Sequence, residues 1–231
     1  MSSLIAEANH GLATPAGTPA SGNMPRRPIG RYGRPRNAAA GHERATYADP
    51  VSSLHCPSPE LSDGATLLRR WSLDDLGCIE EASNDARIPE GTTAPAIYSA
   101  DAGRAFIERQ WSRLDNGEGL SLAISSSVTS TAIGLIVLTL RPQSGVAGVG
   151  YWVVPSQRGQ GHAPRAVRLV THWALSNAGL SRVEAWVEPD NTASQQVLIS
   201  AGYEHEGTLR SFLSFPTRRA DAMVFSSVTA P

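Results

Sequence analysis

The sequence predicts an α/β domain preceded by an N-terminal leader. Apolar runs typical of strands alternate along the chain with segments whose apolar residues recur at helical spacing. The run from Ala132 to Leu140 is apolar almost throughout, as expected for a central strand that is covered on both faces. A loop with two glycines, Gly159 and Gly161, lies between a strand-like and a helix-like segment. We expect the folded domain over residues 62–231 and the leader over residues 1–61.

The leader, residues 1–61, is rich in Ala, Gly, Pro and Ser and carries six arginines between positions 26 and 44. It shows no sustained helical or strand period, so it cannot bury enough apolar surface to offset the entropy of ordering it. The leader is therefore expected to be disordered. Two interpretations stay open: a mildly basic arm that touches an acidic partner such as RNA or a peptide, and a segment without function, either a dispensable extension or the result of a misassigned start codon.

The first half of the domain is expected to contain strands and two helices. Ser72 is a suitable N-cap for the first helix, and the apolar residues Phe106, Ile107, Trp111 and Leu114 lie on one side of the second. The expected elements are a strand at 66–71, helices at 73–86 and 101–116, and strands at 120–125, 132–140 and 146–154.

The second half begins with a helix whose apolar stripe includes Trp173, which is therefore expected in the core. Asn191 or Asp190 caps a shorter helix, and Gly202 ends it. The expected elements are helices at 164–178 and 193–201 and strands at 183–187, 203–213 and 220–227.

The glycine loop has the properties of a phosphate cradle. Gly159 and Gly161 allow the backbone to approach a ligand closely, so that consecutive N–H groups converge on an anion. The following helix adds its unpaired N–H groups and the positive end of its dipole. The alternative is a plain turn. The loop lacks the Gly-Lys-Ser/Thr of a nucleotide triphosphate loop and the third glycine of a dinucleotide fold.

Four ordered motifs carry a resemblance to a known family. Arg158-x-x-Gly161-x-Ala163 is similar to the (Gln/Arg)-x-x-Gly-x-(Gly/Ala) signature of the GCN5-related N-acetyltransferases (GNAT), and it is followed by Asn191-Thr192-Ala193-Ser194, Ala201-Gly202-Tyr203 and Glu206-Gly207-Thr208-Leu209-Arg210. The chain most resembles the Rim-type branch, whose founding members acetylate the N-terminal α-amine of ribosomal proteins. The resemblance covers residues 66–228. It implies a GNAT fold, with a mixed central sheet flanked by helices on both faces, and acetyl-CoA as co-substrate.

The resemblance also implies which residues bind the co-substrate. The strand before the loop is expected to carry a bulge and to splay from its neighbour, leaving backbone groups that pair with the pantetheine. The residues at the matching positions are Trp152, Val153 and Val154 in the strand, Arg158, Gly159, Gln160, Gly161, His162 and Ala163 in the loop, and Asn191. Two of these have other readings: Arg158 as a solvated arginine, and Trp152 as a core aromatic or as part of the acceptor pocket.

The resemblance places the catalytic groups near the short helix expected at residues 193–201. Many family members have a tyrosine where this chain has Leu198, and Rim-type enzymes are thought to use the serine that matches Ser194 to stabilise the leaving thiolate. Asn191 lies three residues before Ser194, so both side chains can face one cleft, although Asn191 can also be only an N-cap.

The general base is not evident in the sequence. Rim-type sequences often carry an acid just before the strand that precedes the loop, where this chain has Gly148-Val149-Gly150. Another departure is Arg165, at a position often held by glutamate. Glu184 is the candidate base and Glu188 a second one, while both also fit surface carboxylates. An α-amine, with a reference pKa of about 7.7–8.0, is partly neutral near pH 7, so such an acceptor needs no strong base.

The C-terminal region resembles the part of Rim-type sequences that borders the acceptor cleft. The matching residues are Glu206, Arg210 and Asp221. A structural salt bridge of Arg210 with a carboxylate explains the same residues equally well.

Composition limits the partners. The net charge is −1, and all 20 basic residues are arginine, which argues against a nucleic-acid binder with a broad basic field. The two cysteines indicate neither a disulfide framework nor a cysteine-based metal site, and no metal is expected. No apolar run reaches the length of about 20 residues that spans a bilayer, so a cytoplasmic protein without a membrane partner is expected, and a homodimer stays open.

We therefore expect an acetyl-CoA-dependent N-acetyltransferase that prefers the N-terminal α-amine of a protein or peptide. Two alternatives stay open: acetylation of a small amine or antibiotic, in resistance or natural-product tailoring, and a catalytically impaired relative that only binds coenzyme A.

Overall fold

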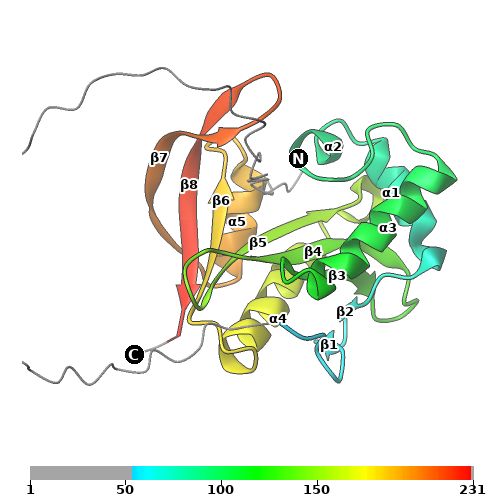
Figure 1. The fold of residues 1–231 in the computed structure, drawn as a ribbon, viewed down its shortest axis with the longest axis horizontal. Coiled ribbons are helices and arrows are strands. Elements are labelled where there is room, and N and C mark those ends of the chain that lie inside the picture. The colour runs from blue at the N-terminus through cyan, green and yellow to red at the C-terminus, as the bar shows by residue number, and fades with distance from the viewer. Residues whose placement is uncertain (1–53, 230–231) are drawn as a thin grey trace, which may run out of the picture. The chain divides into compact units, whose positions relative to one another are not determined.

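The computed structural model describes residues 54–229, which form one mixed β-sheet with helices on both faces (Figure 1). The strands are β1 (Leu61–Ser62), β2 (Thr66–Arg69), β3 (Gly119–Ser126), β4 (Ala132–Leu140), β5 (Val146–Val153), β6 (Arg182–Val187), β7 (Glu204–Ser214) and β8 (Arg219–Val228). The α-helices are α1 (Leu76–Ser83), α2 (Ile88–Gly91), α3 (Ala100–Asp115), α4 (His162–Ser176) and α5 (Thr192–Ser200). Short 3₁₀ turns occupy Leu73–Asp75 and Pro155–Gln157.

The sheet has the strand order β1-β2-β3-β4-β5-β6-β8-β7. Only the β5–β6 pair is parallel, and the other neighbouring strands are antiparallel. The parallel pair requires a crossover, which α4 supplies on one face of the sheet. The expected mixed sheet is thus confirmed.

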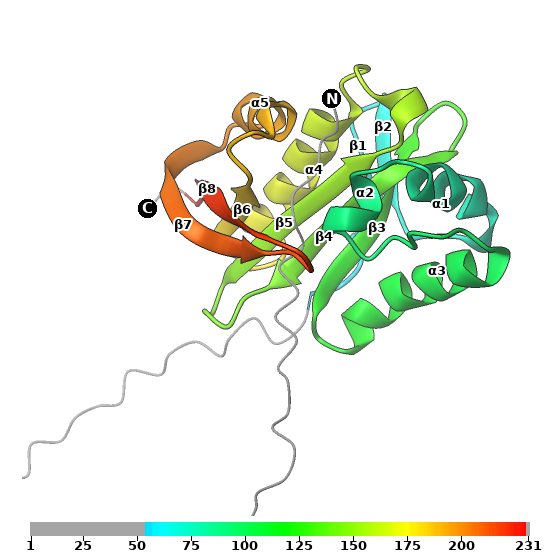
Figure 2. The same ribbon diagram turned by 90° about the horizontal axis from the view of Figure 1, so that it is seen from above.

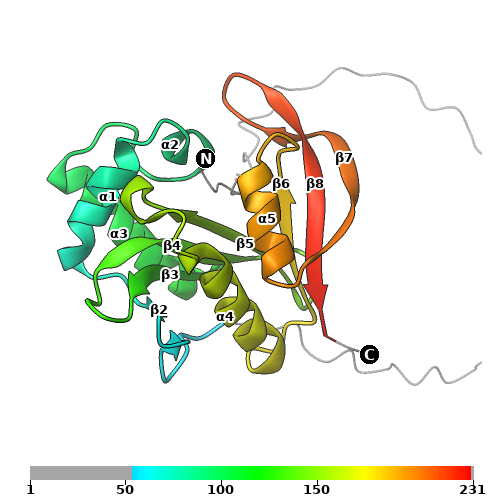
Figure 3. The ribbon, with the colours of Figure 1, turned by 180° about the vertical axis from the view of Figure 1, so that it is seen from behind.

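Adjacent residues of β5 show which helices cover which face. Trp152 packs against Phe106 of α3, with ring centroids 6.5 Å apart, whereas the Tyr151 hydroxyl donates to the Ser194 carbonyl oxygen of α5. Because successive side chains of a strand point to opposite faces, α3 and α5 lie on opposite sides of the sheet. Figures 2 and 3 show α4 beside α5, on the side opposite α3.

The core lies around β3, β4 and β5, whose residues are buried over almost their whole length. This burial confirms the prediction that the apolar run at 132–140 is a central strand. In α4, the stripe residues Ala166, Val167 and Val170 are buried at the sheet, and Trp173 is 5 % exposed, as expected for a core residue.

The region between β2 and α3 differs from the expectation of one helix over 73–86. Ser72 and Asp75 form a capping box around the 3₁₀ turn, and α1 then runs only from Leu76 to Ser83. A second helix, α2, follows with Arg87 as its N-cap. The Asp85 carboxylate supports the turn before it by accepting the N–H groups of Arg87 at 2.9 Å and Ile88 at 3.0 Å.

The N-terminal side of the domain also differs from the expected boundary at residue 62. Leu54 is 4 % exposed in the core, and the rings of His55 and Trp173 meet edge to face at 5.6 Å. Leu61 pairs with Leu68 in β1 and β2. Residues 54–61 are therefore part of the folded domain, and the expectation of disorder for the rest of the leader concerns residues outside the described range.

Candidate active site

The strands β5 and β6 are paired at their N-terminal ends and diverge toward their C-terminal ends. They pair only from Val146 and Arg182 to Gly148 and Glu184, although β5 continues to Val153 and β6 to Val187. The expected splay is thus present. The expected bulge is not, because β5 pairs with β4 without a register shift from Ala147 to Val153.

The pairing with β4 determines which backbone groups of β5 face the gap. The N–H of Arg141 bonds the carbonyl oxygen of Val146, and the N–H of Val154 bonds that of Ile133, both at 2.9 Å. In an antiparallel pair such bonds recur at every second residue, so the even-numbered residues of β5 bond β4 and the odd-numbered ones face β6. Of the three expected pantetheine-binding residues, Val153 presents its backbone to the gap, while Trp152 and Val154 face β4.

The side chain of Trp152 is completely buried. Its ring centroid lies 6.3 Å from that of Trp71 and 6.5 Å from that of Phe106. The core interpretation of Trp152 therefore fits this structure better than a place in the acceptor pocket.

The glycine loop lies at the open end of the gap, between β5 and α4. Gly159 and Gly161 have φ angles of 78° and 79°, which only glycine adopts without strain. Gly161 is the N-cap of α4, so the N–H groups of Gly161, His162 and Ala163 have no partner within the helix, and Pro164 has no N–H. A Cβ on Gly159 would meet no atom within 4 Å. The loop thus presents backbone donors to open space, which fits a diphosphate.

Arg158 is held by the protein itself. Its Nε donates to the carbonyl oxygen of Val153 at 2.9 Å, and its guanidinium lies 2.8 Å from the carboxylate of Asp85. The structure therefore favours a bracing role for Arg158 over a solvated side chain. The partner Asp85, distant in sequence, gave no signal beyond its suitability as a helix cap.

The other loop side chains also contact the protein. The amide of Gln160 donates to Gln157 Oε1 at 3.2 Å, and His162 Nδ1 lies 2.9 Å from Thr66 Oγ1. Burial and then the charge of Arg165 lower the pKa of His162, which keeps its imidazole neutral near pH 7. Ala163 is buried.

Asn191 and Ser194 come together at the first turn of α5. Asn191 Oδ1 accepts the Ser194 N–H at 3.2 Å, which confirms the N-cap. The Tyr151 hydroxyl donates to the Ser194 carbonyl oxygen at 3.2 Å and so ties this turn to β5. Ser194 is 0 % exposed and Asn191 3 %. The pair lies on the α4–α5 face of the sheet, beside the gap.

Glu184 lies on the opposite face, between two arginines. Its carboxylate is 3.3 Å from Arg141 and 3.3 Å from Arg182, and its side chain is 13 % exposed. Arg141 also stacks on Trp186, with its Cζ 3.9 Å from the ring centroid. The structure therefore does not bring Glu184 together with Ser194.

Glu188 follows β6 at the open end of the gap and is paired with Arg218, whose guanidinium also reaches Glu90 of α2 at 3.4 Å. Both candidate bases are thus ion-paired with arginines.

Two of the three C-terminal candidates, Glu206 and Asp221, are engaged in structural contacts, and Arg210 is exposed. Glu206 pairs with Arg182, rather than Arg210, and accepts from Ser226 Oγ at 2.6 Å. These contacts lower the pKa of Glu206 to about 2. Asp221 accepts the N–H of Ser211 at 2.7 Å.

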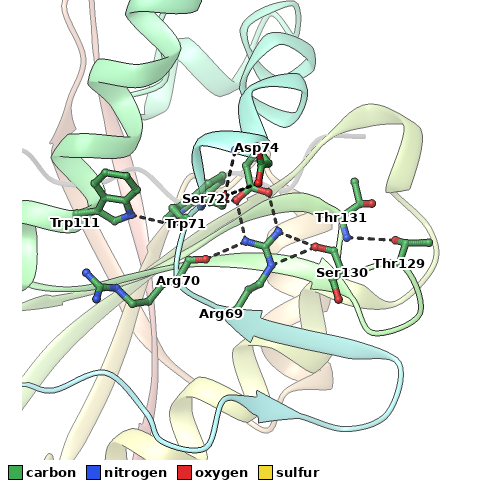
Figure 4. A network of polar contacts seen from close by, with 10 residues as sticks. Arg69, Arg70, Trp71, Ser72, Asp74, Trp111, Thr129, Ser130 and Thr131 are labelled. Carbon is green, nitrogen blue, oxygen red and sulfur yellow. Dashed lines mark hydrogen bonds and ion pairs between the residues drawn. The ribbon is translucent and has the colours of Figure 1, made fainter.

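A pocket of about 620 Å³ that the sequence did not reveal adjoins the start of the glycine loop. Residues of β2 and α1, the β3–β4 turn and residues 154–157 line it. Figure 4 shows the Arg69 guanidinium between the Ser130 carbonyl oxygen and the segment with Ser72 and Asp74. Arg69 also pairs with Asp75 at 2.7 Å. The Ser72-x-x-Asp75 capping box is the sequence signal that could have indicated this side of the pocket.

Within residues 54–229, no three His, Cys, Asp or Glu side chains are grouped so that they could hold a metal ion. None of the helices in that range is long and apolar enough to cross a membrane.

The splayed strands and the glycine loop before a helix are two of the features that the resemblance to the GNAT family implied. The family model described as Acetyltransferase (GNAT) domain matches residues 66–204. The chain therefore belongs to the GNAT family and is an N-acetyltransferase.

Three proteins illustrate the similarity. YoaA of Bacillus subtilis, described as an uncharacterized N-acetyltransferase, is 32 % identical over 171 residues, which are 74 % of this chain and 97 % of YoaA. RimJ of Mycobacterium smegmatis, solved with CoA-disulfide, has a TM-score of 0.63 at 21 % identity and covers 74 % of this chain and 86 % of its own. The microcin self-immunity acetyltransferase MccE, solved with acetyl-CoA and AMP, has a TM-score of 0.64 at 19 % identity over 73 % of this chain and 94 % of its own. The two structures establish a shared fold.

Proposed function

We propose that the protein transfers an acetyl group from acetyl-CoA to an amine and that its preferred acceptor is the N-terminal α-amine of a protein or peptide. Acetyl-CoA supplies a thioester, whose carbon–sulfur bond is exchanged for a carbon–nitrogen bond while one proton moves from the amine to the thiol. The N–H groups of Gly161, His162 and Ala163 would bind the diphosphate. The N–H of Val153, which faces the gap, would pair with the pantetheine or the thioester carbonyl.

Ser194 and Asn191 have complementary proposed roles. Asn191 orients the first turn of α5 by its cap on the Ser194 N–H. The Ser194 hydroxyl would donate a hydrogen bond to the sulfur as negative charge develops there. The Tyr151 hydroxyl ties the turn that carries Ser194 to β5, so the thioester is proposed to lie between β5 and β6 beside this serine.

The proposed preference for an α-amine rests on the ion pairing of the two candidate bases with arginines. Glu184 is paired with Arg141 and Arg182, and Glu188 with Arg218. Neither carboxylate can approach an amine without leaving its guanidinium partner, and Glu184 also lies on the face opposite Ser194. An acceptor with a pKa of about 7.7–8.0 supplies its own neutral fraction near pH 7, whereas a lysine side chain at about 10.4 does not.

The test compares two peptides of one sequence. One has a free N-terminus and no lysine, and the other has a blocked N-terminus and one lysine. We expect kcat/KM to be higher for the free N-terminus and to rise with pH near the pKa of that amine. Glu184→Gln and Glu188→Gln should leave this pH limb in place. Faster acetylation of the lysine peptide, or loss of the limb in either variant, would contradict the α-amine assignment.

A small amine is the second candidate, because MccE matches this chain with a TM-score similar to that of RimJ. Adding small amines and aminoacyl nucleotides to the same assay distinguishes the two. Turnover of these compounds and of neither peptide would favour the small-molecule function. Binding of coenzyme A without thiol release for any acceptor would instead identify a relative that only binds it.

A further inference from the structure

Arg165 lies beside the glycine loop although it belongs to the helix that follows. It is the fourth residue after the N-cap Gly161, and helical side chains lean toward the N-terminus of their helix. Its Nε is accordingly 3.9 Å from the place where a Cβ on Gly161 would be. The side chain is 44 % exposed, so a ligand on the loop can reach it.

Asp63, from the turn between β1 and β2, holds Arg165 in the free protein. The carboxylate lies 2.8 Å from Arg165 Nη1. Its other oxygen accepts the N–H groups of Ala65 at 3.1 Å and Thr66 at 2.9 Å, which fixes the carboxylate in its own turn. Although burial alone would raise the pKa of Asp63, the hydrogen bonds from Thr66, Arg165 and Ala65 hold it below the usual value. Asp63 is therefore a fixed negative charge near pH 7.

An anion on the loop would encounter both charges. It would attract the Arg165 guanidinium and repel the Asp63 carboxylate, with energies that fall with distance and with solvent screening. Because the Asp63–Arg165 pair is partly exposed, breaking it costs little. Arg165 can thus leave the Asp63 carboxylate and bind a phosphate oxygen instead.

We propose that Arg165 is a phosphate ligand of bound coenzyme A and that Asp63 competes with the phosphate for it, so that Asp63 lowers the affinity. This inference rests on the proposed function, because it assumes that coenzyme A binds at the glycine loop. It assigns a binding role to Arg165, which stands where related sequences often have a glutamate. The phosphate is either the diphosphate or the 3′-phosphate.

The fold does not depend on this ion pair. The Thr66–His162 hydrogen bond of 2.9 Å joins β2 to the start of α4 independently, and the buried residues Ala166, Val167 and Val170 attach α4 to the sheet. In Asp63→Asn, the amide oxygen can still accept the N–H groups of Ala65 and Thr66, so this variant removes the charge and keeps the turn.

The experiment measures the Kd of coenzyme A by calorimetry for the full chain and three variants. We expect a Kd about tenfold higher for Arg165→Gln and about threefold lower for Asp63→Asn, in line with the loss or gain of one charge-assisted hydrogen bond. Arg168→Gln is the matched control, because Arg168 lies on the same helix but bonds the Ser200 carbonyl oxygen. Its Kd should stay within about twofold of the wild-type value.

The opposite signs of the two effects separate a phosphate ligand from a structural tether. If Asp63→Asn and Arg165→Gln weaken binding alike, the pair only joins the turn to α4 and the proposal is overturned. An unchanged Kd in Arg165→Gln overturns it as well, while the proposed function stands. If the wild-type protein does not bind coenzyme A, both fail. With 3′-dephospho-CoA, a persisting effect of Arg165→Gln assigns the diphosphate, and a lost effect assigns the 3′-phosphate.

Discussion

Asp85 and Arg158 form an ion pair of 2.8 Å that connects the glycine loop to the start of α2. The same carboxylate accepts the N–H groups of Arg87 and Ile88 at the start of α2, and the same guanidinium donates to the carbonyl oxygen of Val153. Asp85 thus joins α2, the loop and the end of β5. The charge of Arg158 is thus engaged inside the protein.

The first prediction concerns this ion pair. Asp85→Asn retains an oxygen for the N–H groups of Arg87 and Ile88 but removes the charge that faces Arg158. Because the Asp85 side chain is only 9 % exposed, we expect the free energy of unfolding to fall by about 1–3 kcal/mol. Urea denaturation measures this. Asp101→Asn is the control, because Asp101 pairs with Arg104 while 97 % exposed and should have no measurable effect.

The second prediction is the pH dependence of that difference. Although burial alone would raise the pKa of Asp85, hydrogen bonds from Arg158 and the two N–H groups hold it below the usual value. A lowered folded-state pKa gives stability that is present above the unfolded pKa of about 3.9 and is lost as the pH falls through the folded value. The difference between the wild type and Asp85→Asn should be constant from about pH 5 to 8 and shrink below about pH 4. A difference that grows in acid would contradict the assignment.

The third prediction separates the strain at Gly161 from its role in binding. Gly161→Ala should cost about 1 kcal/mol of stability because of its φ of 79°. Gly161→Asp should in addition raise the Kd of coenzyme A by about 100-fold, since its carboxylate would repel the phosphates. Gly202→Ala is the matched control: its φ is 90°, a Cβ there meets no atom within 4 Å, and it lies beyond α5. It should lose similar stability and bind coenzyme A normally.

The sequence was sufficient for the elements around the loop because each has a strong local signal. The apolar run of β4, the stripe of α4 and the glycines at 159 and 161 depend only on neighbouring residues. The Asn191 cap was predictable for the same reason. The short helix α2 was not, because its start depends on Asp85, one of many polar residues that could have ended α1.

The details of the site depend on contacts that no local pattern encodes. Whether Val153 or Val154 faces the gap follows from the pairing of β5 with β4, which sequence spacing alone does not determine. The partners of Arg158 and Glu184 come from segments far apart in the chain. Their residue types suggested a phosphate ligand for Arg158 and a base for Glu184. Only the folded structure shows that each side chain is already ion-paired within the protein.

The fourth prediction tests the start of the folded domain. Removal of residues 1–53 should leave the melting temperature nearly unchanged, because the buried Leu54 is retained. Removal of residues 1–61 should lower it clearly, since Leu54 and the β1–β2 pairing are lost. Leu54→Ala in the shorter truncation should cost about 2–3 kcal/mol and account for much of that loss. Equal melting temperatures for the two truncations would contradict a structural role for residues 54–61.

The last prediction concerns Ser194. If its hydroxyl stabilises the departing thiolate, Ser194→Ala should lower kcat about tenfold, because one hydrogen bond to a charged group is worth about 1.5 kcal/mol. The Kd of acetyl-CoA should change little, since this interaction strengthens only in the transition state. Steady-state kinetics and calorimetry measure the two quantities. Ser200→Ala, an exposed residue at the end of the same helix, is the control and should keep full activity. Full activity of Ser194→Ala, or an equal loss of affinity and kcat, would remove the serine from the chemical step.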